Sequence, residues 1–280
     1  MLEDGSLLDR VNHLIQSGRL SLPVYHPILA QLQESVDRYD DFGELEKLIA
    51  SDQALAAEVL KISNSPFYCG LSPVRTIKNA IIRMGMQQTC RLIVLVGERD
   101  RYKAQDPDLN RMLTELWRHA STTAMAAQWL ARRLRSTAIE EICFLGGLLH
   151  DIGKLIILRA IDEIKKTEKD CGALISLALL REILATAHCP IGYKLLQDWN
   201  VPEIYCQIAR DHHSEEISEG DLPMTIVRLA NEGSRKLGVG LDPNPSLVLA
   251  ATPEASLLNV SEILLAELEV MIEDHISNAA

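Results

Sequence analysis

Apolar residues recur at helical spacing along nearly the whole of this chain, and no segment alternates apolar and polar residues as a half-buried strand does. Aromatic residues make up only 4% of the sequence, while Leu, Ala, Ile and Glu are plentiful, a balance that favours helices over sheets. We therefore expect an all-α fold, a multi-helix bundle with a helical N-terminal subdomain. The expected helices lie near residues 3–18, 26–38, 43–51, 53–64, 75–84, 86–97, 107–134, 138–150, 173–186, 188–198, 202–211, 221–237 and 258–278.

The histidines are distributed unevenly along the 280 residues. Residues 1–105 contain only His13 and His26, whereas the other six histidines follow residue 106. A polar stretch, 99–107, separates these regions and ends in Asp-Pro, a turn signal. We expect an N-terminal helical part over 1–105 and a His-rich helical bundle over 106–280.

The formal net charge is −11 and the pI is about 5.2, which makes the chain a poor candidate for general nucleic-acid binding. A local group of basic residues, Arg132, Arg133 and Arg135, follows a long expected helix. Cations near a helix C-terminus interact favourably with the helix dipole, so we interpret them as helix-end residues.

The six cysteines show no Cys-x-x-Cys spacing and lie mostly in apolar helical segments, so we interpret them as small core residues in a reducing compartment. The first five residues are acidic and resemble no secretory signal. No apolar run approaches the ~18 residues needed to span a bilayer. We expect a cytoplasmic location and no membrane partner.

The run Leu148-Leu149-His150-Asp151-Ile152-Gly153-Lys154 carries an imidazole, a carboxylate and an ammonium inside an otherwise apolar segment. Burying a charged group without a partner costs several kcal/mol, so this run requires an ion or a hydrogen-bond network. A metal ion is the simplest partner for an adjacent His-Asp pair.

Other histidines could complete such a site from further helices. His119 is expected in mid-helix, His150-Asp151 at a helix end, His188 at the start of a helix, and His212-His213 after another. Helical bundles build metal sites from facing helices in this way. Imidazoles plus a carboxylate, with no thiolate, suit one or two divalent transition-metal ions such as Fe, Mn or Zn.

Two further residues of the run could take part. Asp151 could bridge two ions with its two oxygens, and Lys154 could orient that carboxylate or contact a phosphate oxygen. A lone helical histidine is more often a hydrogen-bonded core or surface residue, and His275 is expected at the surface. The residues alone leave a shared metal site and satisfied core histidines equally open.

At these residues the chain resembles the HD superfamily of metal-dependent phosphohydrolases. The order His119, His150-Asp151, His188 and His212-His213 is similar to its HD-GYP branch, which hydrolyses cyclic di-GMP. The sequence departs from that branch at two places. Asn231 stands where catalytic members carry a late metal-binding Asp, and Ser214-Glu215-Glu216 stands where a Gly-Tyr-Pro signature is expected.

The closer resemblance is to the HDOD domain of bacterial signalling proteins, over roughly residues 15–275. It rests on Leu22-Pro23, Lys61-Ile62-Ser63-Asn64-Ser65-Pro66-Phe67-Tyr68, Ile77-Lys78-Asn79-Ala80-Ile81-Ile82-Arg83-Met84-Gly85, Phe144 to Lys154, and Ala230-Asn231. The resemblance implies an HD-type helical bundle and a regulatory, mostly non-catalytic role. Many members lack the metal ligands, but this chain retains His119, His150, Asp151, His188, His212 and His213.

The sequence therefore predicts a cytosolic signal-transduction protein that binds a signalling protein or a small nucleotide-like ligand. Its retained metal ligands could still hold an ion. The alternative is a metal-dependent phosphohydrolase acting on a nucleotide, in which the metal generates hydroxide and Lys154 contacts phosphate. A third hypothesis is a metal that only braces the helices or senses redox state.

Overall fold

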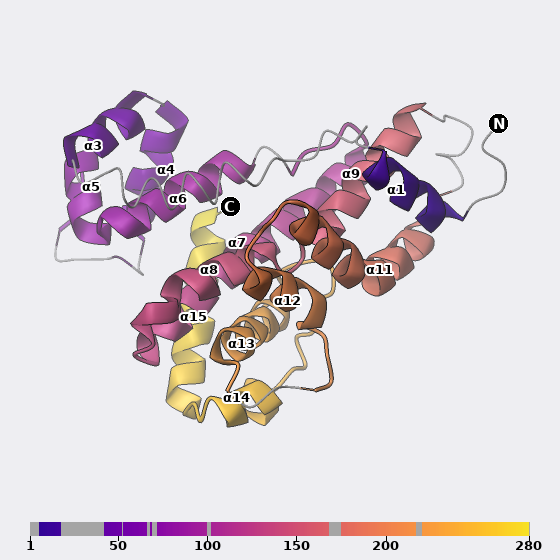
Figure 1. Cartoon of the computed structure of the whole chain (residues 1–280). Helices are drawn as coiled ribbons and strands as arrows, with labels where there is room; N and C mark the ends of the chain where they lie inside the picture. Colours follow the sequence, from indigo (N-terminus) through magenta and orange to yellow (C-terminus); the bar gives the residue numbers. More distant parts are fainter. Residues whose placement is uncertain are drawn as a thin grey trace. The chain divides into compact units, whose positions relative to one another are not determined.

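The computed structural model describes residues 6–17, 42–51, 53–65, 68, 72–99, 102–167, 175–216 and 220–279, and every regular element among them is a helix (Figure 1). The all-α prediction is confirmed. The helix expected near 26–38 lies outside the described residues. The α-helices are α1 (Leu7–Gln16), α3 (Phe42–Ser51), α4 (Gln53–Ser63), α5 (Ile77–Met84), α6 (Met86–Arg99), α7 (Pro107–Arg133), α8 (Glu140–Leu149), α9 (Ile152–Thr167), α11 (Leu177–Asp198), α12 (Glu203–Asp211), α13 (Leu222–Lys236), α14 (Pro253–Leu257) and α15 (Glu262–Ala279).

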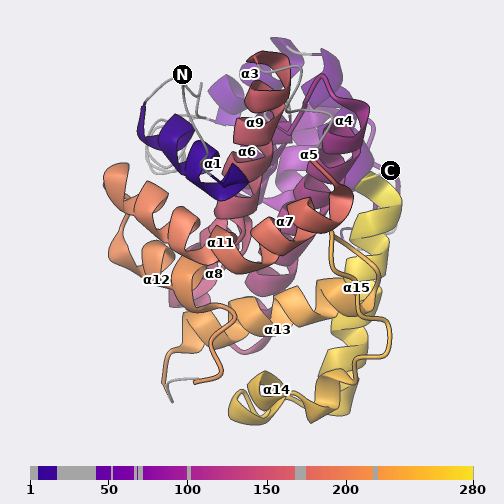
Figure 2. The ribbon, with the colours of Figure 1, turned by 90° about the vertical axis from the view of Figure 1, so that its right-hand side faces the viewer.

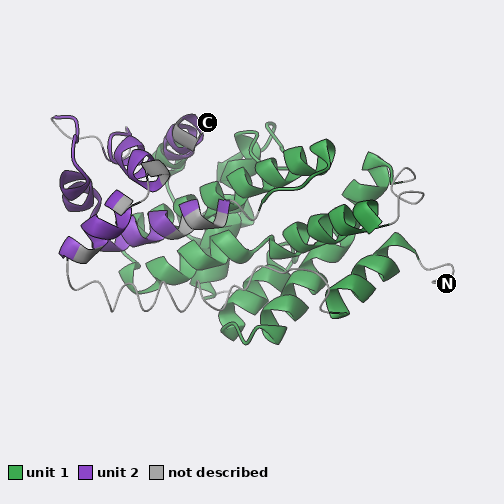
Figure 3. Ribbon diagram, turned by 90° about the horizontal axis from the view of Figure 1, so that it is seen from above, with its two compact units in different colours: residues 1–23, 102–268 green, residues 24–101, 269–280 purple. Residues whose placement is uncertain are grey.

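The chain divides into two compact units (Figure 3). Unit 1 comprises residues 1–23 and 102–268, and unit 2 comprises residues 24–101 and 269–280. Helices α3 to α6 of unit 2 enclose an apolar core around Leu45, Ile49, Val59 and Ile81. Every residue of the predicted metal site belongs to unit 1.

In unit 1, the residues at the start of the long helix α7 determine where it begins. The Asp106 side chain accepts hydrogen bonds from the backbone N–H groups of Asp108 and Leu109, and Pro107 fills the first helical position, where no N–H is needed. Helix α7 packs against α8 and α13, while α11 packs against α9 and α12 (Figure 2). This arrangement directs residues from α7, α8, α11 and α12 toward one region of the unit.

Helix α9 was not predicted, because it lacks a polar face along its first half. Its residues from Ile152 to Leu158 are all buried. Apart from Lys154 these residues are apolar, and a helix segment without a polar face carries no amphipathic signal. The expected helix 138–150 is, in the structure, a short 3₁₀ turn (Thr137–Ile139) followed by α8, and the chain then continues into α9 after only His150 and Asp151.

The prediction of separate helices over 173–186 and 188–198 was wrong, because α11 runs unbroken from Leu177 to Asp198 with Pro190 inside it. Proline removes one helical hydrogen bond, to the carbonyl of the residue four positions before it. Pro190 and that residue, Thr186, are both exposed, so water can replace the missing bond. His188 therefore lies within a helix and not at its start.

Several surface expectations can be compared with the structure. Arg132 pairs with Glu140 and Arg133 with Glu267, so these helix-end cations face carboxylates. His275, expected at the surface, is instead partly buried, and its Nε2 is shielded without a hydrogen-bond partner among the described residues. None of the described helices combines the length and the apolar character needed to cross a bilayer.

Candidate metal centre

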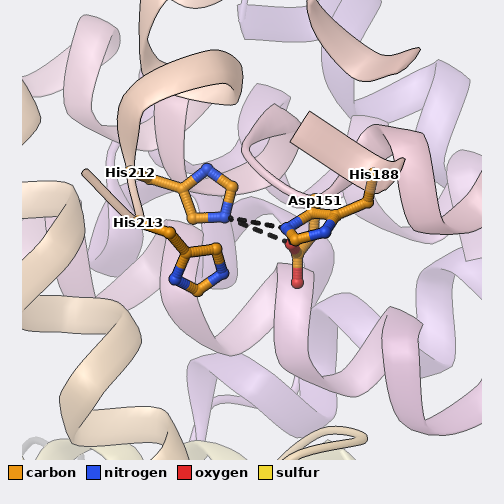
Figure 4. Close-up of side chains that lie close together, drawn as sticks. All are labelled: Asp151, His188, His212 and His213. Carbon is orange, nitrogen blue, oxygen red and sulfur yellow. Dashed lines mark hydrogen bonds and ion pairs between the residues drawn. The ribbon is translucent and has the colours of Figure 1, made fainter. Parts of the chain in front are cut away.

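The structure brings all six predicted ligands together in unit 1. We call them the His/Asp cluster: His119, His150, Asp151, His188, His212 and His213. His119 comes from α7 and His188 from α11, His150 and His212 directly follow α8 and α12, and Asp151 lies between α8 and α9. His119, His150, Asp151, His188 and His212 are buried, whereas His213 is more exposed. Figure 4 shows the part of the cluster around Asp151, His188, His212 and His213.

Four of the imidazoles are held by backbone carbonyls through their Nδ1 atoms. His119 Nδ1 lies 3.2 Å from the Val239 oxygen, and His150 Nδ1 lies 2.8 Å from the Gly147 oxygen. His188 and His212 make equivalent contacts with carbonyls of their own helices, to Leu184 at 2.6 Å and to Ile208 at 3.1 Å. Because a carbonyl can only accept, each Nδ1 must carry the proton. The Nε2 lone pairs remain free, as metal-ligating histidines require.

Those free lone pairs converge on one carboxylate. His188 Nε2 and His212 Nε2 each lie 3.4 Å from Asp151 Oδ1 and 3.4 Å from one another (Figure 4). On the other oxygen, Asp151 Oδ2, His150 Nε2 lies at 3.4 Å and His119 Nε2 at 3.6 Å. Asp151 is 3% exposed, and its Oδ1 has no hydrogen-bond partner among the described residues. Lone pairs facing a carboxylate repel it unless a cation lies between them.

The donor spacing fits a metal ion. With bonds of about 2.0–2.2 Å, two nitrogen or oxygen ligands of one ion lie about 2.8–3.8 Å apart at bond angles of about 90–120°. The Nε2–Nε2 and Nε2–Oδ distances of the cluster fall between 3.2 and 3.6 Å. The cluster therefore has the donors, the spacing and the orphaned oxygen that a cation site requires.

The protonation states agree with this interpretation. Burial lowers the pKa of His119 to about 3 and that of His213 to about 4, and it also lowers the pKa values of His188 and His212. Burial alone would raise the pKa of Asp151, but the Lys154 ammonium holds it well below its usual range. Neutral imidazoles beside an ionised carboxylate are the states that bind a metal.

A cavity of about 280 Å³ opens onto the cluster. Its wall includes His119, Asp151, His188 and His213, together with the polar residues Lys154, Cys189, Asn231, Arg235 and Asp242. His150 and His212 are buried and are not part of this wall. A small ligand in the cavity could therefore reach an ion held by the cluster.

Two glycines allow the close approaches that this geometry needs. Gly153, the second residue of α9, lies so near to α11 that a Cβ atom there would be 1.9 Å from the His188 carbonyl oxygen. Gly240 has a φ of +106°, a conformation that favours glycine, and a Cβ there would lie 2.9 Å from His119 Nδ1. At both positions any side chain larger than hydrogen would collide with a histidine of the cluster or with its backbone.

Arg228 of α13 holds the segment that carries His212 and His213. Its guanidinium donates to the Ser214 carbonyl at 2.6 Å and to the Asp211 carbonyl at 3.4 Å, one residue beyond each end of the histidine pair. It also pairs with Glu254 at 2.7 Å in a largely buried contact. Arg228 is therefore a positioning residue for the His/Asp cluster, although it contacts none of the proposed ligands.

We expect Arg228→Met to weaken metal binding by about 10- to 100-fold, the usual cost of losing a residue that orients metal ligands. Calorimetric titration of the metal-free protein with Zn²⁺ measures this change. Arg132→Met, which removes a partly exposed pair with Glu140 in the same unit, is the control and should bind as the wild type does. Equal affinities in all three proteins would contradict the positioning role.

The metal-free protein should lose stability as the pH falls from about 6.5 to about 4. An unfolded histidine binds its proton near pH 6.5, whereas His119 and His213 of the folded cluster have pKa values of about 3 and about 4. In this window the unfolded chain takes up protons that the folded chain does not, so acid favours unfolding. Urea unfolding across this range should show the loss. It should be smaller in His213→Gln and unchanged in His13→Gln, an exposed control; a pH-independent midpoint would contradict the prediction.

The sequence did not identify several residues that support the cluster. The Val239 carbonyl and Arg228 act through backbone groups, for which no side-chain motif exists. Cys189 was interpreted as a core residue, yet it is only partly buried, lines the cavity and lies 3.3 Å from His188 Nε2. Burial raises the pKa of this thiol to about 12, so it is a neutral group beside the cluster in the metal-free protein.

Comparison with known proteins places the chain in a family. The model of the HDOD domain matches residues 22–215. An uncharacterized protein of Treponema pallidum (strain Nichols) is 27% identical over 213 residues, which are 75% of this chain and 39% of that protein. The chain thus spans well under half the length of this curated relative.

Solved structures share the fold. An HDOD domain protein of unknown function from Geobacter sulfurreducens superposes with a TM-score of 0.68 at 22% identity, over 97% of this chain and 96% of that one. A protein of Shewanella amazonensis SB2B, named "Putative metal-dependent phosphohydrolase", gives 0.68 at 20% identity, over 96% and 98%. A "Putative signal transduction protein" of Marinobacter aquaeolei VT8 gives 0.58 at 18% identity, over 98% and 64%. With the family model matching more than half of its length, the chain belongs to the HDOD domain family.

Proposed function

We propose that this chain is a cytosolic regulatory HDOD protein whose His/Asp cluster holds a divalent transition-metal ion, and that it acts by binding a partner protein or a small ligand. The observation that carries the metal assignment is Asp151 Oδ1, a buried carboxylate oxygen with no hydrogen-bond partner among the described residues. The Nε2 atoms of His188 and His212 face it as unprotonated donors. Imidazole and carboxylate donors favour Fe, Mn or Zn.

The regulatory assignment rests on what surrounds the cluster. Asn231, which is buried and lines the cavity, stands where catalytic HD proteins carry a further metal-binding carboxylate. A neutral amide is a weaker ligand and gives the ion no charge. The cluster consequently contains a single carboxylate, Asp151. These features favour an ion that is held without catalysis over an ion that activates water for phosphodiester cleavage.

An ion in this position would link separate helices of unit 1. The donors around Asp151 Oδ1 come from α11, from the end of α12 and from the segment between α8 and α9. A ligand that binds only the folded state stabilises it, so occupancy of the site would be coupled to the stability of this helical arrangement. A partner that recognises the arrangement would therefore respond to the metal.

A second candidate function, metal-dependent phosphohydrolysis, is favoured by one observation. The cavity beside the cluster carries Lys154 and Arg235, two cations suited to a phosphate group. In that case, the bound ion would polarise a phosphoryl oxygen and lower the pKa of water. Lys154 would then contact the phosphate as well as its partner Asp151.

A turnover assay distinguishes the two candidates. The protein is loaded with Mn²⁺, Fe²⁺ or Zn²⁺ and offered cyclic dinucleotides, cyclic mononucleotides and bis-p-nitrophenyl phosphate. The regulatory assignment predicts that product formation does not exceed that of the Asp151→Asn variant with any of these metals. Metal-dependent turnover that disappears in Asp151→Asn would establish the hydrolase instead.

A further inference from the structure

The two oxygens of Asp151 divide the His/Asp cluster into two halves with different surroundings. Asp151 Oδ1 faces His188 and His212, and His213 belongs to the same group of donors. Asp151 Oδ2 faces His119 and His150. Each half could hold an ion if geometry were the only requirement, because the donors within each half lie within 4.8 Å of one another.

Only one of these halves already contains a cation. Lys154 Nζ lies 2.9 Å from Asp151 Oδ2 and donates a hydrogen bond to it. Lys154 is only 8% exposed. Because α9 begins directly after Asp151, Lys154 lies one helical turn further along and on the same side as Asp151. A metal ion bound to Oδ2 would have to share this oxygen with an ammonium group, and the two cations would repel each other.

The charge of the cluster also limits the number of ions. Its only carboxylate is Asp151, and the residue that could have supplied a second, Asn231, is neutral. Two divalent ions beside Lys154 would place five positive charges against one negative charge. One divalent ion and the Lys154 ammonium leave a much smaller excess of positive charge over Asp151. The neutral imidazoles can bind that one ion as ligands.

Movement of Lys154 into the cavity would not relieve this imbalance. The cavity wall already carries the guanidinium of Arg235, whose partner is Glu232 at 2.8 Å. Apart from Asp151, its wall carries the carboxylate of Asp242, which is exposed to solvent. Lys154 would therefore exchange a buried carboxylate at hydrogen-bond distance for a site beside another cation.

We propose that the cluster holds a single metal ion, on the Oδ1 side with His188, His212 and His213, and that the Lys154 ammonium occupies the place of a second ion on the Oδ2 side. This proposal depends on the proposed function only in that the cluster binds metal at all. Lys154 thus acts as a built-in cation that fixes the metal stoichiometry. His119 and His150 belong to the Lys154 side and serve as its polar surroundings.

The test is the metal content of the full chain after saturation with Co²⁺ and removal of free metal. The expected result is about one equivalent in the wild type and about two in Lys154→Met, which removes the charge and keeps a long side chain. Lys154→Gln is the second variant, and thermal unfolding shows whether each variant is folded. Asp151→Asn, which lacks the shared carboxylate, gives the background.

Each outcome has one meaning. About two equivalents in the wild type would overturn the single-ion proposal but leave the metal site intact, and one equivalent in both folded Lys154 variants would overturn the role of Lys154. No metal above the Asp151→Asn background would instead reject the proposed metal site itself. If neither variant folds, the electron paramagnetic resonance spectrum of the Mn²⁺-loaded wild type decides. An isolated-ion spectrum supports the proposal, and an exchange-coupled pair overturns it.

Discussion

Asp151→Asn is expected to abolish metal binding and to destabilise unit 1. The substitution keeps the shape of the side chain but removes the only carboxylate of the His/Asp cluster. It also leaves Lys154, which is 8% exposed, without its ion-pair partner. Removing one member of a buried ion pair costs about 3–5 kcal/mol because the remaining charge stays buried. Calorimetric titration with Zn²⁺ and urea unfolding of the metal-free protein measure the two effects.

The matched control is Asp162→Asn on α9. Asp162 is also a buried carboxylate paired with a lysine, Lys166, at 2.6 Å, but it lies outside the cluster. This variant should lose stability and still bind Zn²⁺ with wild-type affinity. The double variant Asp151→Asn/Lys154→Met should recover part of the lost stability without recovering metal. Zn²⁺ binding by Asp151→Asn at wild-type affinity would contradict the assignment.

Gly153→Ala adds one methyl group, and we expect it to lower stability more than one methyl group added anywhere else at the site. The new Cβ would lie 1.9 Å from the His188 carbonyl oxygen and 3.0 Å from the backbone nitrogen of Gly192. Because backbone atoms of α11 cannot rotate away, α9 and α11 must separate. Overpacking usually costs about 1–3 kcal/mol, and this rigid contact should reach or exceed the upper end. Thermal unfolding and Zn²⁺ affinity should both fall, since His188 moves away from Asp151.

Gly146→Ala provides the comparison for this prediction. A Cβ at Gly146 would meet Ile208 Cδ1 at 2.8 Å, which is the far end of a flexible side chain. Alanine also favours a helix over glycine by about 1 kcal/mol, which offsets part of the contact. We therefore expect a small change in the unfolding temperature and unchanged Zn²⁺ affinity. Equal effects of the two substitutions would contradict the proposed close approach of α9 and α11.

The sequence was sufficient to predict the fold class and the residues that meet at the cluster. Helical spacing predicted α7, α12 and α13 to within one residue at each end, because these helices are amphipathic and carry caps or turn residues. The motif around His150 and Asp151 indicated the centre of the cluster. The placement of His119, His188 and His212 then followed from a family resemblance rather than from spacing alone.

Other features could not be predicted because their causes are tertiary. Helix α9 is buried on all sides in its first half, and α11 passes through Pro190, so local patterns failed at both. The pairing of Lys154 with Asp151 Oδ2 required the chain to continue as a helix directly after Asp151. The orphaned Oδ1 atom, which carries the metal assignment, depends on the orientation of imidazoles from distant helices.

Membership of the HDOD family establishes the domain and leaves the ligand and the partner to experiment. The proposed metal ion gives these experiments a starting point, because it would join the helices that surround the cavity. A protein that depends on this ion for stability would change its surface when the ion is removed. Partner binding should then be measured with the metal-loaded and the metal-free protein in parallel.

The most direct test of the central claim is the elemental content of freshly purified protein, measured by mass spectrometry without added metal. We predict Fe, Mn or Zn in an amount close to one ion per chain, and almost none in His188→Ala, which removes a ligand on the Oδ1 side of Asp151. His13→Ala, an exposed histidine of α1, should retain the full amount. Wild-type protein that contains no more metal than His188→Ala, and gains none when Zn²⁺ is supplied, would contradict the account.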